Sequence, residues 1–214
     1  MTTIAPDRLS GLSPAPVRPT DIVGLSVQQY QQMIEQGIIP EDSSIELLRG
    51  VMVRKDRGVL GEDSMVHSPL HATIVRVLTI LGSRVNSERY LLQVQLPVEC
   101  PPDSVPEPDA AIVRGQPWDY EQRLPGAADV SCVIEVAHSS LQRDRQDKLP
   151  IYAVSGIGQY VLINLQNSTI EVYEDPDPQG EQYRTRRTLQ RGESLSLRLP
   201  DGSGLAVPVA DVLP

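Results

Sequence analysis

Two carboxylates and one lysine carry the clearest chemical signal in this sequence. Asp109 follows Pro108 and leads into an apolar run, Glu135 lies inside a second apolar run at 133–136, and Lys148 follows on a more polar segment. Runs of this kind normally enter a protein core, where a carboxylate is costly unless a cation or a hydrogen-bond donor meets it. The two acids therefore predict a metal site.

Lysine is scarce in this chain, which draws attention to each one. Of 19 lysine and arginine residues, only Lys55 and Lys148 are lysines. A lysine ammonium is a compact donor that can orient a water molecule or a phosphate oxygen, whereas arginine suits bidentate contacts. Lys148 is the candidate cation of the site, and Lys55, in the charged run 54–57, is interpreted as a surface residue.

Each of these residues also has a purely structural interpretation. Asp109 would begin a strand as a turn acid, and Glu135 would form a buried salt bridge with an arginine or with Lys148. Asp144 and Lys148 would form an exposed helical ion pair, which contributes only about 0.3–0.5 kcal/mol. A Ser–His nucleophile at 138–140 is disfavoured, since no oxyanion-hole or elbow motif surrounds it.

Composition limits the class of protein. A length of 214 residues suffices for one well-buried domain. The hydrophobic content is 40%, but only 4% of residues are aromatic and none is Phe, so the core must be built from Leu, Val and Ile, which favours mixed α/β structure. A net charge of −9 argues against a protein held on nucleic acid by bulk electrostatics.

Cysteine usage and hydropathy point to a cytoplasmic location. Cys100 and Cys132 match no zinc spacing and are expected to be reduced, buried thiols. No apolar run approaches the ~20 residues of a membrane span. The first residues show no basic segment followed by an apolar one, so we expect no secretion signal and no membrane partner.

The order of predicted elements gives an α/β fold. Residues 1–25 are rich in proline and predict an N-terminal arm, followed by a single domain over 26–214. Apolar spacing predicts helices at 27–36, 69–85 and 141–154, and a hairpin at 45–53 turning at Arg49-Gly50. Pro150 requires that the third helix either starts close to Asp147 or is kinked.

Alternating and β-branched segments predict the strands. We expect them at 90–98, 109–113, 130–136, 159–164, 169–173, 182–188 and 194–199. The last four would form a C-terminal β meander, with strands 159–214 packed on the rest of the domain. Residues 55–67 and 114–129 predict polar loops.

The ordered set of motifs resembles a known superfamily. The segments that carry the resemblance, across about residues 26–175, are Ile45-Glu46-Leu47-Leu48-Arg49-Gly50, His71 at a helix start, Pro108-Asp109, Val133-Ile134-Glu135-Val136-Ala137-His138-Ser139-Ser140, Asp144, Lys148, Tyr152, Gly156 and the strand 159–163. The chain resembles the PD-(D/E)XK nuclease-like superfamily and, within it, a large uncharacterised restriction-endonuclease family of bacteria. The resemblance implies a restriction-endonuclease-like mixed β-sheet flanked by helices.

The resemblance also implies a site. Asp109 and Glu135 would bind Mg²⁺ or Mn²⁺, with the carbonyl of Val136 as a third ligand, because hard cations prefer oxygen ligands. The superfamily places a lysine two residues after the Glu, but this chain has Ala137 there. The family's displaced lysine corresponds to Lys148.

Two more residues complete the implied constellation. Glu46 corresponds to the family's early acidic residue, as a further ligand or as the holder of a water molecule. His71 is expected to support the ligands rather than to bind the metal.

The expected function is that of a metal-dependent endonuclease that hydrolyses DNA phosphodiester bonds, with DNA as a transient, metal-assisted partner. The alternative is a catalytically inactive nuclease-fold module that serves in binding or interaction, an interpretation motivated by Ala137, by Pro150 near Lys148 and by the acidic net charge. The position of Lys148 distinguishes the two functions: in an active enzyme, its ammonium should point toward the carboxylates of Asp109 and Glu135. We also expect a homodimer, because enzymes that cut duplexes often pair.

Overall fold

The computed structural model describes residues 23–40, 43–55 and 69–213. The predicted arm at 1–25 and the polar loop at 55–67 therefore lie almost entirely outside the described residues. Within the described residues, no helix is long and apolar enough to cross a membrane.

A six-stranded mixed sheet organises the described residues, in the order β3-β4-β5-β6-β7-β8. Its strands are β3 (Tyr90–Val94), β4 (Ala110–Arg114), β5 (Val130–Ala137), β6 (Gln159–Asn164), β7 (Thr169–Asp177) and β8 (Gln182–Leu189). Strands β5 and β6 pair in parallel and the other neighbours are antiparallel. A parallel pair needs a crossover, which the helical segment between β5 and β6 supplies.

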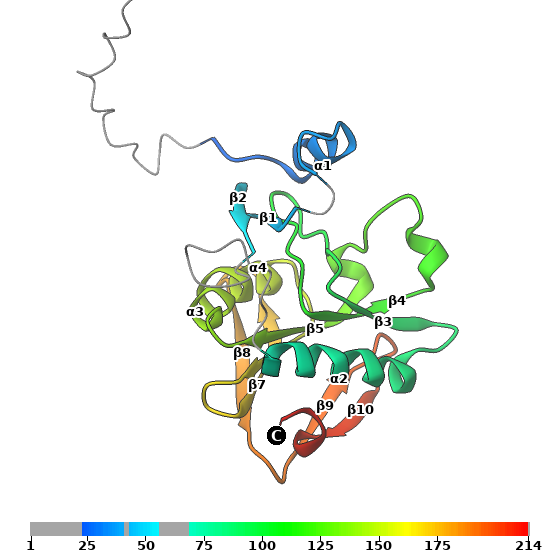
Figure 1. The fold of residues 1–214 in the computed structure, drawn as a ribbon, viewed down its shortest axis with the longest axis vertical. Helices are drawn as coiled ribbons and strands as arrows, with labels where there is room; N and C mark the ends of the chain where they lie inside the picture. Colours follow the sequence, from blue (N-terminus) through cyan, green and yellow to red (C-terminus); the bar gives the residue numbers. More distant parts are fainter. Residues whose placement is uncertain (1–22, 41–42, 56–68, 214) are drawn as a thin grey trace, which may run out of the picture.

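Helices cover both faces of this sheet (Figure 1). Helix α2 (Pro69–Val85) packs on one face, and the crossover segment of α3 (Leu141–Arg143), the π-helical turn η4 (Asp144–Lys148) and α4 (Leu149–Val154) packs on the other. The mixed α/β class predicted from the sequence is confirmed.

Strand alternation sorts the core into two clusters, because successive side chains point to opposite faces of a sheet. Ile134 and Val136 join the cluster under α2, whereas Val133 and Ala137 join the cluster under α4. The strand register therefore places Glu135 on the α4 face, between Val133 and Ala137.

Smaller elements pack at one end of the sheet. The helix α1 (Val27–Glu35) begins with a capping box at Ser26, and the hairpin β1 (Ile45–Leu48) and β2 (Val51–Arg54) turns at Arg49-Gly50, where both residues have positive φ. A third apolar cluster, of Val27, Tyr30, Ile39, Leu47 and Val105, joins them. The 114–129 connection contains two short 3₁₀ turns, η2 (Pro117–Tyr120) and η3 (Ala127–Asp129).

The predicted strands differ from the structure at β3 and in the C-terminal meander. The strand β3 ends at Val94 rather than at 98, and Gln95 has a positive φ. The predicted meander is interrupted, since β9 (Ser194–Arg198) leaves the sheet and pairs with β10 (Gly204–Pro208), which is followed by α5 (Val209–Val212). These last elements pack their apolar residues against the α2 face, so burial of that face determines their position.

Pro150 lies in α4, which starts at Leu149, so the alternative of a helix start close to Asp147 is confirmed. The residues from Leu141 onward form the short helix α3 and then a π-helical turn over Asp144–Lys148, which stands directly before α4. Pro150 has no N–H to donate to the carbonyl four residues earlier, so the regular α-helical pattern cannot be completed there. The wider turn accommodates this loss.

Candidate active site

The predicted site residues come together in one small pocket. Its cavity measures about 30 Å³ and is lined by four acids (Glu46, Asp109, Glu135, Asp144), four basic side chains (Lys55, His71, Arg143, Lys148), Val136 and Ser140. Among these acids, Glu46 lies on β1 and Asp109 directly precedes β4. Glu135 lies on β5 and Asp144 on η4. Four separate segments of the chain thus contribute to one polar pocket.

Lys148 is the centre of this pocket. Its ammonium lies 2.9 Å from Oε1 of Glu46 and 3.0 Å from Oε1 of Glu135, and the side chain is only 4% exposed. Burial would lower the pKa of Lys148, but the charges of Glu135, Glu46 and Asp144 raise it above its ordinary value. The lysine therefore carries its charge at neutral pH and donates hydrogen bonds.

Glu135 is a buried acid among other acids. Desolvation, only partly offset by Lys148, raises the pKa of Glu135 to about 8, and the neighbouring carboxylates of Asp144, Asp109 and Glu46 contribute to the rise. Desolvation likewise raises the pKa of Asp144 to about 6. A cation would relieve this accumulation of negative charge.

Asp109 is held in place by β5 and α2. Its Oδ2 accepts a hydrogen bond from the backbone N–H of Val136 at 2.8 Å, and its Oδ1 lies 3.3 Å from Nε2 of His71. Burial alone would raise the pKa of Asp109, but the hydrogen bond and charge of His71, with Lys55 and the Val136 N–H, hold it below its ordinary value. Asp109 is thus ionised at neutral pH.

Glu46 links the hairpin to the loop before Asp109. Its Oε1 accepts the backbone N–H of Glu107 at 2.7 Å as well as the ammonium of Lys148. Its Oε2 is buried and makes no hydrogen bond to any residue that the structure describes. Buried polar atoms normally have partners, so this oxygen is available to a ligand.

These residues fit a hard divalent cation. Such ions prefer carboxylate oxygens, and Mg²⁺ is commonly bound through one or two carboxylates together with water and substrate phosphate. Within the described residues, no group of three or more His, Cys, Asp or Glu side chains is arranged to hold a metal ion by itself. The predicted ligands are two carboxylates, Asp109 and Glu135, and the carbonyl of Val136, and all three remain predictions.

The purely structural interpretations of these residues differ in how they agree with the structure. Asp144 and Lys148 are not an exposed pair, since each is 3% exposed, so that interpretation is wrong. The salt bridge from Glu135 to Lys148 is present, and it belongs to the same pocket as the other predicted residues. His71 contacts Asp109, as expected of a supporting residue.

Lys55 is the residue that the sequence interpretation missed. Its ammonium contacts the carbonyl of Glu107 at 2.9 Å and the Glu107 carboxylate at 2.8 Å, and the side chain is only 11% exposed. Both lysines of the chain therefore line the pocket. The scarcity of lysine was the available signal, but the charged neighbours of Lys55 suggested a solvated surface.

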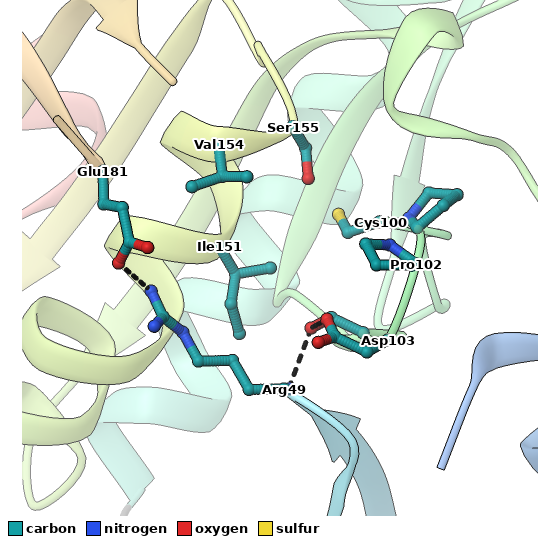
Figure 2. Close-up of a pocket in the computed structure, with 10 residues that line it drawn as sticks. Arg49, Cys100, Pro102, Asp103, Ile151, Val154, Ser155 and Glu181 are labelled. Atoms are coloured by element: carbon teal, nitrogen blue, oxygen red, sulfur yellow. Dashed lines mark hydrogen bonds and ion pairs between the residues drawn. The ribbon is translucent and has the colours of Figure 1, made fainter. Parts of the chain in front are cut away.

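A larger cavity, of about 300 Å³, lies between the β1–β2 turn, residues 100–104 and α4 (Figure 2). The ion pair of Arg49 and Glu181 crosses one side of it at 2.5 Å, and Cys100 lies on the opposite side. Burial raises the pKa of Cys100 to about 12, so its thiol is a poor nucleophile. This cavity lacks the convergent carboxylates and the buried lysine of the smaller pocket.

The comparisons with known proteins identify the family and the fold of the chain. The profile of the Uma2 family, described as "Putative restriction endonuclease", matches residues 27–210. A crystal structure of "a putative nuclease belonging to DUF820 from Anabaena variabilis ATCC 29413" superimposes with a TM-score of 0.60 at 16% identity, covering 88% of this chain and 97% of that chain. That likeness establishes the fold. No curated protein matches the sequence significantly. By the extent of the family match, the chain belongs to the Uma2 family.

Proposed function

We propose that this protein is a metal-dependent endonuclease that hydrolyses DNA phosphodiester bonds. The observation that carries the proposal is the buried ammonium of Lys148, within 3.0 Å of both Glu46 and Glu135 and in one pocket with Asp109. A lysine out of reach of Asp109 and Glu135 would favour the inactive-module alternative, and Lys148 contacts Glu135 at 3.0 Å. The family description supports nuclease chemistry.

Each residue has a role in this proposal. Asp109 and Glu135 would hold Mg²⁺ or Mn²⁺ together with the carbonyl of Val136, and Glu46 would act as a further ligand or hold a water molecule. When bound, the cation polarises the phosphate and lowers the pKa of water. Lys148 stays protonated, so it orients the attacking water or stabilises negative charge on the phosphate as a donor.

The test is nicking of supercoiled plasmid DNA with Mg²⁺ or Mn²⁺. Asp109→Ala, Glu135→Ala and Lys148→Met are expected to abolish nicking, because each removes a ligand or the donor of the site. The control Glu174→Gln alters an acid of β7 that pairs with Arg187 outside the pocket, and it should nick as the wild type does. Calorimetry should show Mn²⁺ binding to wild type and not to Asp109→Ala.

Two outcomes contradict the proposal. One is a wild-type protein that neither binds Mn²⁺ nor nicks any DNA form with several metals. The other is nicking that survives Asp109→Ala and Glu135→Ala, since a contaminating nuclease would then explain it.

A homodimer in the cytoplasm belongs to the same proposal. A duplex presents two strands, so a pair of sites suits its cleavage. Cys100 and Cys132 are free and buried, which suits a reducing compartment. Sedimentation at equilibrium should give twice the chain mass, and a single-chain mass would exclude the dimer.

A further inference from the structure

A buried tyrosine hydroxyl lies beside the pocket and contacts one of its acids. Tyr152 on α4 is fully buried and donates its hydroxyl to Oε1 of Glu135 at 2.8 Å. Lys148, on the preceding turn of the same helical segment, donates to the same oxygen at 3.0 Å. Two donors thus converge on Oε1, and neither holds Oε2.

Packing alone does not account for this hydroxyl. The ring of Tyr152 packs against Tyr160 at 5.3 Å between centroids, and a phenylalanine ring would fill nearly the same space. The tyrosines of this cluster each bond a different acceptor: Tyr160 the carbonyl of Asp144, Tyr183 the carbonyl of Ile157. Among the described tyrosines, only Tyr152 donates its hydroxyl to an acid of the pocket.

The direction of these bonds matters for the carboxylate. A buried glutamate held by a single donor can rotate about its last torsion, since such torsions have broad minima. Two donors on one oxygen, from two successive helical turns, fix the plane of the carboxylate. Outer hydrogen bonds of this kind orient ligands in metal sites, and their loss typically lowers metal affinity about 10–100-fold.

We propose that Tyr152 is a positioning residue of the candidate metal site: its hydroxyl holds Oε1 of Glu135, so that Oε2 is the oxygen offered to a divalent cation. This inference rests on the proposed function. Tyr152 acts through Glu135 and does not touch the substrate.

The experiment compares two tyrosine-to-phenylalanine variants by Mn²⁺ calorimetry. Tyr152→Phe should weaken Mn²⁺ binding about tenfold, because Glu135 loses one of the two bonds that orient it. Tyr183→Phe removes a buried hydroxyl from the same ring cluster, whose partner is a backbone carbonyl, and should bind Mn²⁺ as the wild type does. Thermal melts of both variants report any loss of stability separately from metal affinity.

The outcomes separate this inference from the proposed function. Wild-type binding of Mn²⁺ with unchanged affinity in Tyr152→Phe overturns the role of Tyr152 alone, as does an equal loss in both variants. No Mn²⁺ binding by wild type overturns the proposed function and this inference together.

A crystal of wild-type protein soaked in Mn²⁺ gives a test that needs no variant to fold. The expected result is Mn²⁺ on Oε2 of Glu135 with the Tyr152 hydroxyl still on Oε1. Mn²⁺ on Oε1, with the hydroxyl displaced, overturns the inference.

Discussion

At the scale of single residues, two acids of the pocket share one lysine, so these acids outnumber the cation that they contact. Glu46 and Glu135 both direct Oε1 to Lys148, and Asp109 is served by His71 and the Val136 backbone. Removing one partner of such a buried pair leaves an uncompensated charge, which is strongly destabilising. The same imbalance makes the pocket suited to a divalent cation.

The raised pKa of Glu135 predicts how stability depends on pH. In metal-free protein this pKa is about 8, against an ordinary value of 4.5. The fold favours the protonated acid, so this contribution is complete below 4.5 and is lost as the pH rises through about 8. We expect the melting temperature in EDTA to fall between about pH 6 and pH 9, and Glu135→Gln to flatten this fall.

Asp144, Asp109 and Lys148 leave that pH range to Glu135. Asp144 has a pKa of about 6, so most of its change is over at lower pH, and the contribution of Asp109, whose pKa is lowered, is complete above its ordinary value of 3.8. Lys148, with a raised pKa, keeps its contribution below 10.5. If the melting temperatures of wild type and Glu135→Gln changed with pH in parallel across this range, Glu135 would not be the group that causes the fall.

At the scale of elements, the π-helical turn η4 places one acid and one lysine in the pocket. Asp144 and Lys148 are its first and last residues, and both side chains are buried. Arg145, between them, holds the turn to β7 through a two-point contact with the buried Glu171, in which Nε lies 3.2 Å from Oε2. Tyr173 and Arg186 contact the same carboxylate, so the turn is tied to the sheet.

Arg145→Ala should loosen this connection. Hydrogen bonds to charged groups contribute about 1.5–3 kcal/mol, and partial exposure of Arg145 reduces this, so we expect a loss of about 1–2 kcal/mol in the free energy of unfolding, measured with urea. Gln142→Ala, on the exposed side of the same segment, is the control and should lie within about 0.5 kcal/mol of wild type. A null effect of Arg145→Ala would show that packing alone holds the turn.

At the scale of the whole molecule, electrostatics oppose DNA binding except where a cation intervenes. The chain carries a net charge of −9, and its pocket contains four carboxylates. Duplex DNA is held largely through neutralised phosphates. The proposed substrate therefore needs a divalent cation to approach the acids.

Fluorescence anisotropy with labelled duplex DNA tests this dependence. At physiological salt we expect binding in Ca²⁺, an ion that bridges carboxylate and phosphate oxygens, and at least a tenfold weaker affinity in EDTA. Asp109→Ala should bind weakly in both buffers. Equal affinity of wild type in Ca²⁺ and EDTA would show that DNA binds elsewhere on the protein.

Much of the fold is encoded locally. The capping box at Ser26, the Arg49-Gly50 turn and the apolar spacing of residues 69–85 each act within a few residues, and the structure has each element where the sequence predicts it. The departure of β9 from the sheet was not predictable in this way, because it depends on burial against the distant α2 face.

The sequence by itself determined which residue types are unusual: acids in apolar runs at Asp109 and Glu135, and a scarce lysine at Lys148. The resemblance carried by the sequence motifs already implied Glu46, and only the tertiary structure decided that Lys55 joins them and that Asp144 is buried. The physical reason is the distance along the sequence over which each effect acts. Periodicity assigns a side chain to a face of its own element, whereas the packing of α4 on the sheet determines which side chains meet across that face.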